Sequence, residues 1–296
     1  MKLLITGASG FIGSRLVSAA CEALGAKNVI ALSSKQISIC PSIKYQGSDL
    51  RLSVDDHDLL SSVEVLVHVG AFTPKTALKV NSIEDCNKNI SFTENLLALP
   101  FKYLKKFIYI STIDVYQPAE LTSEHTPTLP ATLYGWSKLY CERMISVFAT
   151  SQDIPFQILR IGHVYGPGEE KYEKFLPKAI KNILSGDKVE LWGDGHEIRS
   201  FIYIDDVISA ILQSINLTHG QDPINIVGGK PVSIREILDL LILISGKNVE
   251  ITSSEFRGAK RNYIFDNTKL RQNLLLREID LSIGLQAEYD YMAGLM

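Results

Sequence analysis

Short apolar runs alternate with helical patterns along the first half of the chain. The main runs are almost continuous in apolar residues, which is typical of strands buried on both faces of a parallel sheet. They lie at residues 2–6, 28–33, 63–71, 106–112 and 156–161, with a weaker run at 43–46. Segments with helical spacing, such as 14–24 and 85–99, separate them. The alternation predicts an α/β fold with a doubly wound parallel sheet.

The alternation becomes irregular after Gly166-Pro-Gly168, where turn residues interrupt the apolar runs. We therefore expect a larger first domain that consists of residues 1–165 together with a later segment of about residues 200–228. Residues 166–199 and 229–296 should form a smaller C-terminal lobe that covers the crevice at the strand ends.

The composition excludes several classes of protein. The chain has 296 residues and a formal net charge of −3, and 21% of its residues are charged and 46% hydrophobic, as in ordinary globular proteins. It has no basic run that would indicate a nucleic-acid partner. Its apolar runs are too short for a signal peptide or a membrane span, so we expect no membrane partner.

The cysteines and histidines form no metal-binding pattern. The cysteines lack CxxC spacing, so we expect reduced thiols, no metal and a cytoplasmic protein. They are Cys21, Cys40, Cys86 and Cys141. His68 lies inside an apolar run, where a packed core histidine is a simpler interpretation than a metal ligand.

A glycine-rich turn follows the first strand and leads into the first helix. Its glycines, Gly7, Gly10 and Gly13, would let the backbone approach a pyrophosphate, and the helix N-terminus would offer free N–H groups. The context predicts dinucleotide binding by Gly7, Ser9, Gly10, Phe11 and Ile12, and the alternative is a purely structural turn.

The end of the second strand bears on the choice of cofactor. NAD-binding sites usually place an acidic residue there for the ribose 2′-hydroxyl. This chain has Ser33, Ser34 and Lys35, which would suit a 2′-phosphate. The cofactor is therefore predicted to be NAD or NADP, with NADP favoured, although an exposed polar turn would explain the same residues.

Tyr134 and Lys138 lie four residues apart in a helical pattern. At this spacing two side chains share one helix face. An ammonium near a phenol lowers the pKa of the phenol, so the pair suits proton transfer to or from a hydroxyl or carbonyl. The alternative is an ordinary helix with one aromatic side chain and one solvated lysine.

Several motifs occur in one order along the chain. They are Gly7-xx-Gly10-xx-Gly13, Asp49-Leu50, Gly70-Ala71, Ser111-Thr112-xx-Val115-Tyr116, Tyr134-xxx-Lys138, Tyr165-Gly-Pro and Gly193-Asp-Gly-xxx-Arg199-Ser-Phe. Together they resemble the extended short-chain dehydrogenase/reductase family, and within it the NAD-dependent epimerase/dehydratase group that acts on nucleotide sugars. The resemblance covers nearly the whole chain.

The resemblance implies a Rossmann domain that binds NAD(P) and a C-terminal lobe that binds a nucleoside-diphosphate sugar. By position, Tyr134 matches the catalytic base and acid of the family. Lys138 matches the lysine that holds the nicotinamide ribose and lowers the pKa of the tyrosine. Thr112 matches the residue that hydrogen-bonds the reacting oxygen.

Other positions match binding residues of the family. Asp49 and Leu50 match the pair beside the adenine ring, and Gly70-Ala71 ends a strand that faces the cofactor crevice. Arg199 matches an arginine that grips the substrate pyrophosphate, a role that suits its planar fork of donors.

Some positions depart from the family pattern. Ile113 stands where 4,6-dehydratases often carry an acid, and it cannot protonate a leaving hydroxyl, so that reaction is disfavoured. His163 replaces an asparagine near the substrate phosphates. The late substrate-binding arginine is either Arg257 or Arg261, and Arg257 is our candidate.

We expect an NAD(P)-dependent nucleotide-sugar epimerase that transfers a hydride at a hexose carbon, most simply C4. One alternative is an NADPH-dependent 4-keto-6-deoxysugar reductase, and another is a non-catalytic NAD(P)-sensing regulator. The resemblance also implies a homodimer built from the helix around 87–99 and the helix of Tyr134. Their apolar positions are Ile90, Leu96, Leu97, Leu139, Met144 and Ile145, some of which must face the sheet.

Overall fold

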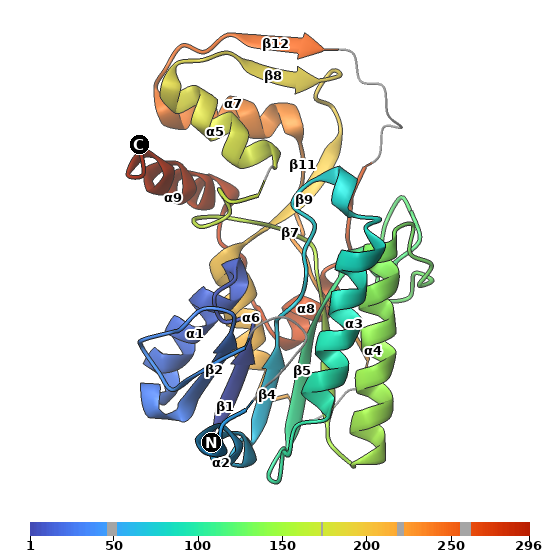
Figure 1. Ribbon diagram of the computed structural model, residues 1–296. Helices are drawn as coiled ribbons and strands as arrows, with labels where there is room; N and C mark the ends of the chain where they lie inside the picture. Colours follow the sequence, from blue (N-terminus) through green and yellow to red (C-terminus); the bar gives the residue numbers. More distant parts are fainter. Residues whose placement is uncertain (46–51, 173, 218–221, 255–261) are drawn as a thin grey trace.

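The computed structural model describes residues 1–45, 52–172, 174–217, 222–254 and 262–296. The predicted site residues Asp49, Leu50 and Arg257, and the alternative Arg261, lie outside them. Figure 1 shows a larger lobe built around a sheet with helices on both faces, and a smaller lobe above the ends of its strands.

The larger lobe contains a parallel sheet, which within the described residues has seven strands in the order β10-β6-β5-β4-β1-β2-β3. Every neighbouring pair is parallel, so the predicted doubly wound sheet is confirmed. The strands are β1 (Leu3–Thr6), β2 (Val29–Ser33), β3 (Ser42–Lys44), β4 (Val65–His68), β5 (Lys106–Thr112), β6 (Phe156–Ile161) and β10 (Ile224–Ile226).

Helices cover both faces of this sheet (Figure 1). They are α1 (Phe11–Leu24), α2 (Val54–Ser61), α3 (Ile83–Leu97), α4 (Leu133–Ser151) and α6 (Ile204–Ser214), with 3₁₀ turns η1 (Ala26–Asn28), η2 (Ala77–Lys79) and η3 (Ile113–Val115). Alternate residues of one strand enter different cores: Leu3 and Ile5 pack on the α1 side, and Leu4 on the α3 side. Burial on both faces explains why the strands read as continuous apolar runs.

Three of the apolar positions named for a dimer interface on α3 and α4 face the core of the subunit. Leu96, Leu139 and Ile145 are buried in the subunit, so they cannot meet a partner chain. The apolar and aromatic side chains that α4 exposes include Trp136, Tyr140 and Val147. The sequence alone did not distinguish these faces, because apolar residues occur on both sides of α4.

The smaller lobe joins short strands and helices from the second half of the chain. Its strands are β7 (His163–Tyr165), β9 (Ile198–Tyr203) and β11 (Pro231–Ser233) in one sheet, and β8 (Val189–Trp192) and β12 (Ile251–Ser254) in another. Its helices are α5 (Phe175–Ser185), α7 (Ile234–Ser245) and α9 (Leu281–Ala293), while α8 (Thr268–Asn273) packs beside β10. Since β10 pairs with β6 and α6 packs on α1, this part of the second half returns to the larger lobe.

Candidate active site

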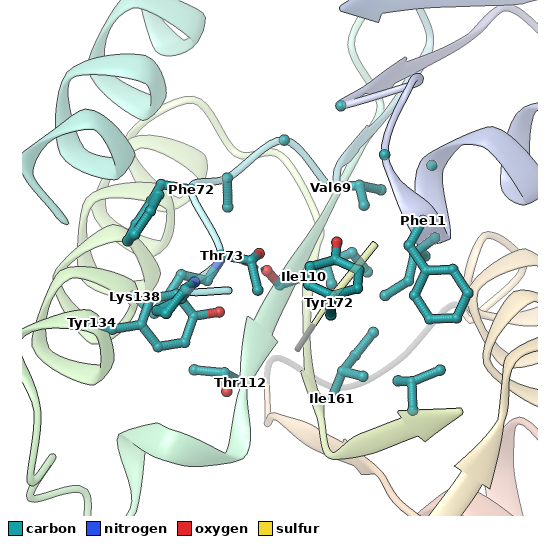
Figure 2. A pocket seen from close by; sticks show the side chains of 18 of the residues that line it. Phe11, Val69, Phe72, Thr73, Ile110, Thr112, Tyr134, Lys138, Ile161 and Tyr172 are labelled. Carbon is teal, nitrogen blue, oxygen red and sulfur yellow. Dashed lines mark hydrogen bonds between the residues drawn. The ribbon is translucent and has the colours of Figure 1, made fainter. Parts of the chain in front are cut away.

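A cavity of about 610 Å³ opens at the carboxyl ends of the strands in the centre of the large sheet. Figure 2 shows side chains from both ends of this cavity, from Phe11 at one end to Tyr134 at the other. The predicted site residues that line it are Gly7, Ser9, Gly10, Phe11, Ile12, Ser33, Ser34, Gly70, Ala71, Thr112, Tyr134, Lys138 and His163. Lys35 and Arg199 are not among the described residues that line it.

The glycine turn packs so closely that side chains would not fit. Gly7 has a φ of +66°, and a Cβ there would lie 2.6 Å from the Cα of Gly70. A Cβ at Gly13 would lie 2.1 Å from the carbonyl oxygen of Gly7. The turn therefore requires glycine at these positions and brings the backbone to the cavity wall.

The helix that follows this turn presents its N-terminus to the cavity. Gly10 is the N-cap of α1, and this described helix has no side-chain cap and no acidic residue in its first turn. The N–H groups of the first turn and the positive end of the helix dipole are thus suited to an anion. This arrangement of free N–H groups beside the glycine turn fits a dinucleotide pyrophosphate.

Helix α1 begins at Phe11, three residues earlier than its apolar pattern indicated, because the last turn of the glycine motif is already helical.

The turn after β2 gives no support to the preference for NADP. The buried Ser33 hydroxyl donates to the carbonyl oxygen of Lys35 at 2.6 Å and accepts from its N–H at 3.2 Å. Its hydrogen is thus used within the turn. The Lys35 side chain is exposed and lies outside the cavity lining, which matches the alternative of a polar turn.

Tyr134 and Lys138 lie at the opposite end of the cavity on α4. The hydroxyl of Thr132 caps this helix by accepting from the Gly135 N–H at 3.1 Å. Tyr134 is buried, and the side chains of Thr112 and Thr73 lie close enough to its hydroxyl to affect its pKa. Figure 2 shows these three side chains together. The fold thus joins the predicted tyrosine and threonine, which lie on different elements.

The side chain of Lys138 is hydrogen-bonded to the backbone near the end of β5. Its ammonium donates to the carbonyl oxygen of Ile110 at 2.7 Å and lies 4.4 Å from the centroid of the Tyr109 ring. Burial lowers the pKa of Lys138 to about 8, while Cys141 and Glu142 act in the opposite direction. This ammonium can therefore lose its proton in a mildly alkaline solution.

The pKa of Tyr134 is raised above its ordinary value, contrary to the expectation for a tyrosine beside a lysine. Burial is the main cause and the carboxylate of Asp114 adds to it, while the polar side chains of Thr73 and Thr112 act in the opposite direction. The four-residue spacing of Tyr134 and Lys138 did not reveal the raised pKa. It arises from loss of water around the buried tyrosine and from the nearby Asp114, and both depend on the tertiary structure.

His163 and Arg199 meet at one aromatic ring. The His163 ring lies 5.0 Å from that of Tyr263, and the Arg199 guanidinium lies 4.8 Å from the same centroid. Arg199 also pairs with Glu197 at 2.8 Å and donates to the carbonyl oxygen of Ile198. Of the two, only His163 belongs to the described lining of the cavity, so a role of Arg199 toward substrate stays a prediction.

The cavity also contains residues that the sequence patterns did not indicate. Among them are four polar residues on loops or short turns, Thr73, Asp114, Tyr172 and Lys174. Loop residues carry no periodicity, so pattern reasoning misses them. The signals available were Thr73 shortly after Gly70-Ala71 and Asp114 two residues after Thr112.

His68 belongs to the core beneath the site. Its Nδ1 lies 2.7 Å from the Thr6 hydroxyl oxygen and its Nε2 lies 3.1 Å from that of Thr93. Burial, and then the charge of Lys138, hold its pKa well below the ordinary value. His68 is therefore a neutral, packed histidine, as its sequence context indicated.

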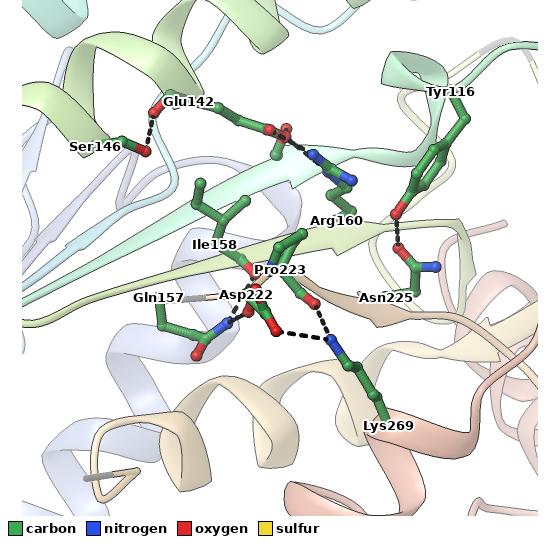
Figure 3. Close-up of polar contacts among 11 residues, drawn as sticks. Tyr116, Glu142, Ser146, Gln157, Ile158, Arg160, Asp222, Pro223, Asn225 and Lys269 are labelled. Carbon is green, nitrogen blue, oxygen red and sulfur yellow. Dashed lines mark hydrogen bonds and ion pairs between the residues drawn. The ribbon is translucent and has the colours of Figure 1, made fainter. Parts of the chain in front are cut away.

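A buried polar network supports α4 from the sheet side (Figure 3). Arg160 on β6 donates to both carboxylate oxygens of Glu142, and the Ser111 hydroxyl donates to the same carboxylate. The Arg160 guanidinium lies 4.7 Å from the Tyr116 ring, whose hydroxyl donates to Asn225 at 2.7 Å. Because Glu142 follows Lys138 by one helical turn, the network ties the face of α4 that carries Lys138 to β5 and β6.

Two negative findings apply to the part of the chain that the structure describes. It contains no cluster of three or more His, Cys, Asp or Glu side chains that could hold a metal ion. None of its helices combines the length and the apolar character needed to cross a membrane.

Comparison with known proteins identifies the family. The profile of the NAD dependent epimerase/dehydratase family matches residues 3–227. The chain belongs to this family. Its enzymes are of the extended short-chain dehydrogenase/reductase type, so the resemblance read from the motifs is confirmed, and the chain is an enzyme of that type.

Individual relatives of the family cover the whole chain. An uncharacterized UDP-glucose epimerase of Bacillus subtilis is 29% identical over 100% of this chain and 99% of its own length. The structure of a UDP-glucuronic acid 4-epimerase from Bacillus cereus in complex with NAD has a TM-score of 0.82, at 28% identity and coverage of 100% and 99%. A UDP-glucose 4-epimerase from Thermotoga maritima with UDP-glucose has a TM-score of 0.83, at 26% identity and the same coverage.

Proposed function

We propose that this enzyme is an NAD-dependent nucleotide-sugar 4-epimerase acting on a UDP-hexose. The observation that carries the proposal is the meeting of Tyr134, Thr112 and Lys138 at one end of a cavity whose other end is a glycine-rich cradle for a pyrophosphate. The similar proteins named for UDP-sugar 4-epimerisation and for NAD support the choice of carbon, nucleotide and cofactor.

In this proposal each residue at the catalytic end has one task. Tyr134 takes the proton of the C4 hydroxyl and later returns it, while Thr112 hydrogen-bonds the same oxygen. Lys138 donates to the ribose of the cofactor. NAD, when bound, supplies the hydride acceptor and a positive charge. That charge would lower the pKa of Tyr134, which burial and Asp114 raise.

The surroundings of Thr112 argue against a 4,6-dehydratase. Ile113 is buried in an apolar cluster with Val115 and Leu139, and it is not among the described residues that line the cavity. An acid that protonates the departing C6 hydroxyl is therefore missing from this position. The NADPH-dependent 4-ketoreductase is the second candidate, but the turn at Ser33 does not favour it.

The test combines cofactor analysis with a product assay. Nucleotide released from the denatured protein should have the mass of NAD. Incubation with UDP-glucose or UDP-N-acetylglucosamine should give the 4-epimer, detected by NMR. General acid–base catalysis contributes ~10²–10⁴-fold, so Tyr134→Phe should lower kcat by about that factor while leaving NAD bound. Reduction of a 4-keto-6-deoxysugar by NADPH without epimerisation would favour the reductase instead.

We also propose that the enzyme is a cytoplasmic homodimer joined through α3 and α4. All four cysteines are described as free thiols, which fits a reducing compartment. On α4, Trp136 is 46% exposed, Tyr140 56% and Val147 71%, and such an apolar face is suited to an isologous contact. Trp136→Glu should give monomers in sedimentation experiments at micromolar concentration, whereas Leu243→Glu on α7 should not.

A further inference from the structure

The loop between β7 and α5 packs on the first turn of α1, which carries the phosphate cradle. Arg15 of α1 donates twice to the carbonyl oxygen of Pro167, at 3.2 and 3.1 Å. A Cβ at Gly168 would lie 3.3 Å from the Phe11 ring. The Tyr172 ring meets the Phe11 ring edge-on, with centroids 6.2 Å apart and planes at 60°. The smaller lobe therefore contacts the cofactor domain beside the glycine turn.

The backbone of Tyr172 is fixed on both sides. Its N–H donates to the carbonyl oxygen of Glu169 at 2.9 Å, and its own carbonyl accepts from the Lys174 N–H at 2.8 Å. The Lys174 ammonium pairs with the buried Glu169 at 2.8 Å and lies 5.4 Å from the Tyr172 ring. The position of this ring is thus set by the loop.

The Tyr172 side chain belongs to the cavity. It is one of the residues that line the cavity. Figure 2 shows its ring between Phe11 on one side and Tyr134 with Thr112 on the other. It is only partly buried: one part of the ring packs against the core, and another part lines the cavity.

We propose that Tyr172, paired with Phe11, retains the dinucleotide in the cavity and sets how slowly it leaves. This inference rests on the proposed function. A cofactor that runs from the glycine turn to Tyr134 passes the middle of the cavity, where the Tyr172 ring lies. The contact between the two rings joins the two lobes at that point, and in this proposal that contact opens before the cofactor leaves. An epimerase regains its cofactor in each cycle and needs no exchange, so slow release suits this chemistry.

The experiment measures the rate of NAD release from the intact protein. The protein is loaded with radiolabelled NAD and chased with an excess of unlabelled NAD. Loss of the aromatic pair and of the buried area of the Tyr172 ring should change the rate constant of release by about tenfold or more. Tyr172→Ala should therefore release NAD about tenfold faster than the wild type, or faster still. Tyr172→Phe keeps the ring and should stay within about twofold of the wild type. Tyr103→Ala, at a tyrosine 61% exposed outside the cavity lining, is the matched control and should not change the rate.

A double-mutant cycle separates the ring pair from a general loosening of the loop. Phe11→Leu should also speed release, and Phe11→Leu combined with Tyr172→Ala should be little faster than Tyr172→Ala alone, because either change removes the same contact. Strictly additive effects, or an unchanged rate in Tyr172→Ala, would overturn the inference. If the wild type binds no NAD, the proposed function itself fails. If it binds NAD and Tyr172→Ala releases it at the wild-type rate, only the role of Tyr172 fails.

Discussion

Arg160 on β6 and Glu142 on α4 form a buried two-bond ion pair, with Nε to Oε1 at 3.0 Å and Nη2 to Oε2 at 2.7 Å. Glu142, Lys138 and Tyr134 succeed one another at four-residue intervals on α4. The pair therefore holds the helix that carries the proposed catalytic residues against the strand next to β5.

Breaking this pair should destabilise the protein strongly. Removing one partner of a buried ion pair costs about 3–5 kcal/mol, because the other charge remains buried. Glu142→Ala should therefore lower Tm markedly in a thermal-shift measurement. Asp239→Ala, which removes the exposed pair with Arg235 on α7, should cost less than about 1 kcal/mol.

A double variant tests whether the cost comes from the unpaired charge. Glu142→Met combined with Arg160→Met replaces the pair by apolar groups and should recover much of the lost Tm. If the double variant is less stable than Glu142→Ala, the contact of Arg160 with the Tyr116 ring, which only the double variant loses, matters more than the unpaired charge.

Asp114 should add to the effect of burial in raising the pH at which Tyr134 loses its proton. Its negative charge raises the pKa of Tyr134, so Asp114→Asn should lower that pKa while keeping a similar shape beside Thr112. The expected result is a shift of the tyrosine ionisation, measured by ultraviolet absorbance against a Tyr134→Phe blank, to lower pH. The rising limb of kcat/KM against pH should move in the same direction. An unmoved or upward-shifted ionisation would contradict the assigned role of this carboxylate.

Glu288 should make the protein less stable as the pH rises. Burial, and then the neighbouring Glu169, raise the pKa of Glu288 to about 9, far above its value in the unfolded chain. The stability that comes from its protonated form is complete below about pH 4.5 and is lost as the pH rises toward 9. Glu288→Gln keeps a neutral side chain, so its Tm should exceed that of the wild type at pH 8 by more than at pH 5.

The partner of Glu288 offers a contrast. Glu169 pairs with Lys174, so Glu169→Gln removes the counter-charge of that ammonium and should lower Tm at pH 8. Equal Tm values for the wild type and Glu288→Gln across this range would show that the Glu288 carboxyl is not held protonated by its surroundings.

Arg199 remains our candidate for the substrate diphosphate. Charge-assisted hydrogen bonds contribute roughly 1.5–3 kcal/mol, and each ~1.4 kcal/mol is tenfold in Kd. Arg199→Ala should therefore raise the Kd for UDP by about one to two orders of magnitude in calorimetric titration, with little change for NAD. Glu197→Gln removes one partner of the guanidinium and should leave UDP binding as tight or tighter. Unchanged UDP binding in Arg199→Ala would remove this residue from the substrate site.

The amino-acid sequence by itself determined the features that depend on near neighbours. Apolar runs and helical spacing were sufficient to predict β5 and β6 at their observed bounds. The glycine spacing predicted a tight turn before a helix, and the four-residue interval between Tyr134 and Lys138 predicted a shared helix face. These features depend on backbone conformation and local packing, which the order of residues largely dictates.

The tertiary structure alone decided which distant groups meet and how much water they lose. Tyr172 reaches Phe11 from the other lobe, and Glu169 lies beside Glu288 on the last helix. The raised pKa of Tyr134 comes from burial and from Asp114, not from its spacing to Lys138. Desolvation and charge interactions depend on distances across the fold, and those distances exist only once the sheet, its loops and the second lobe have packed together.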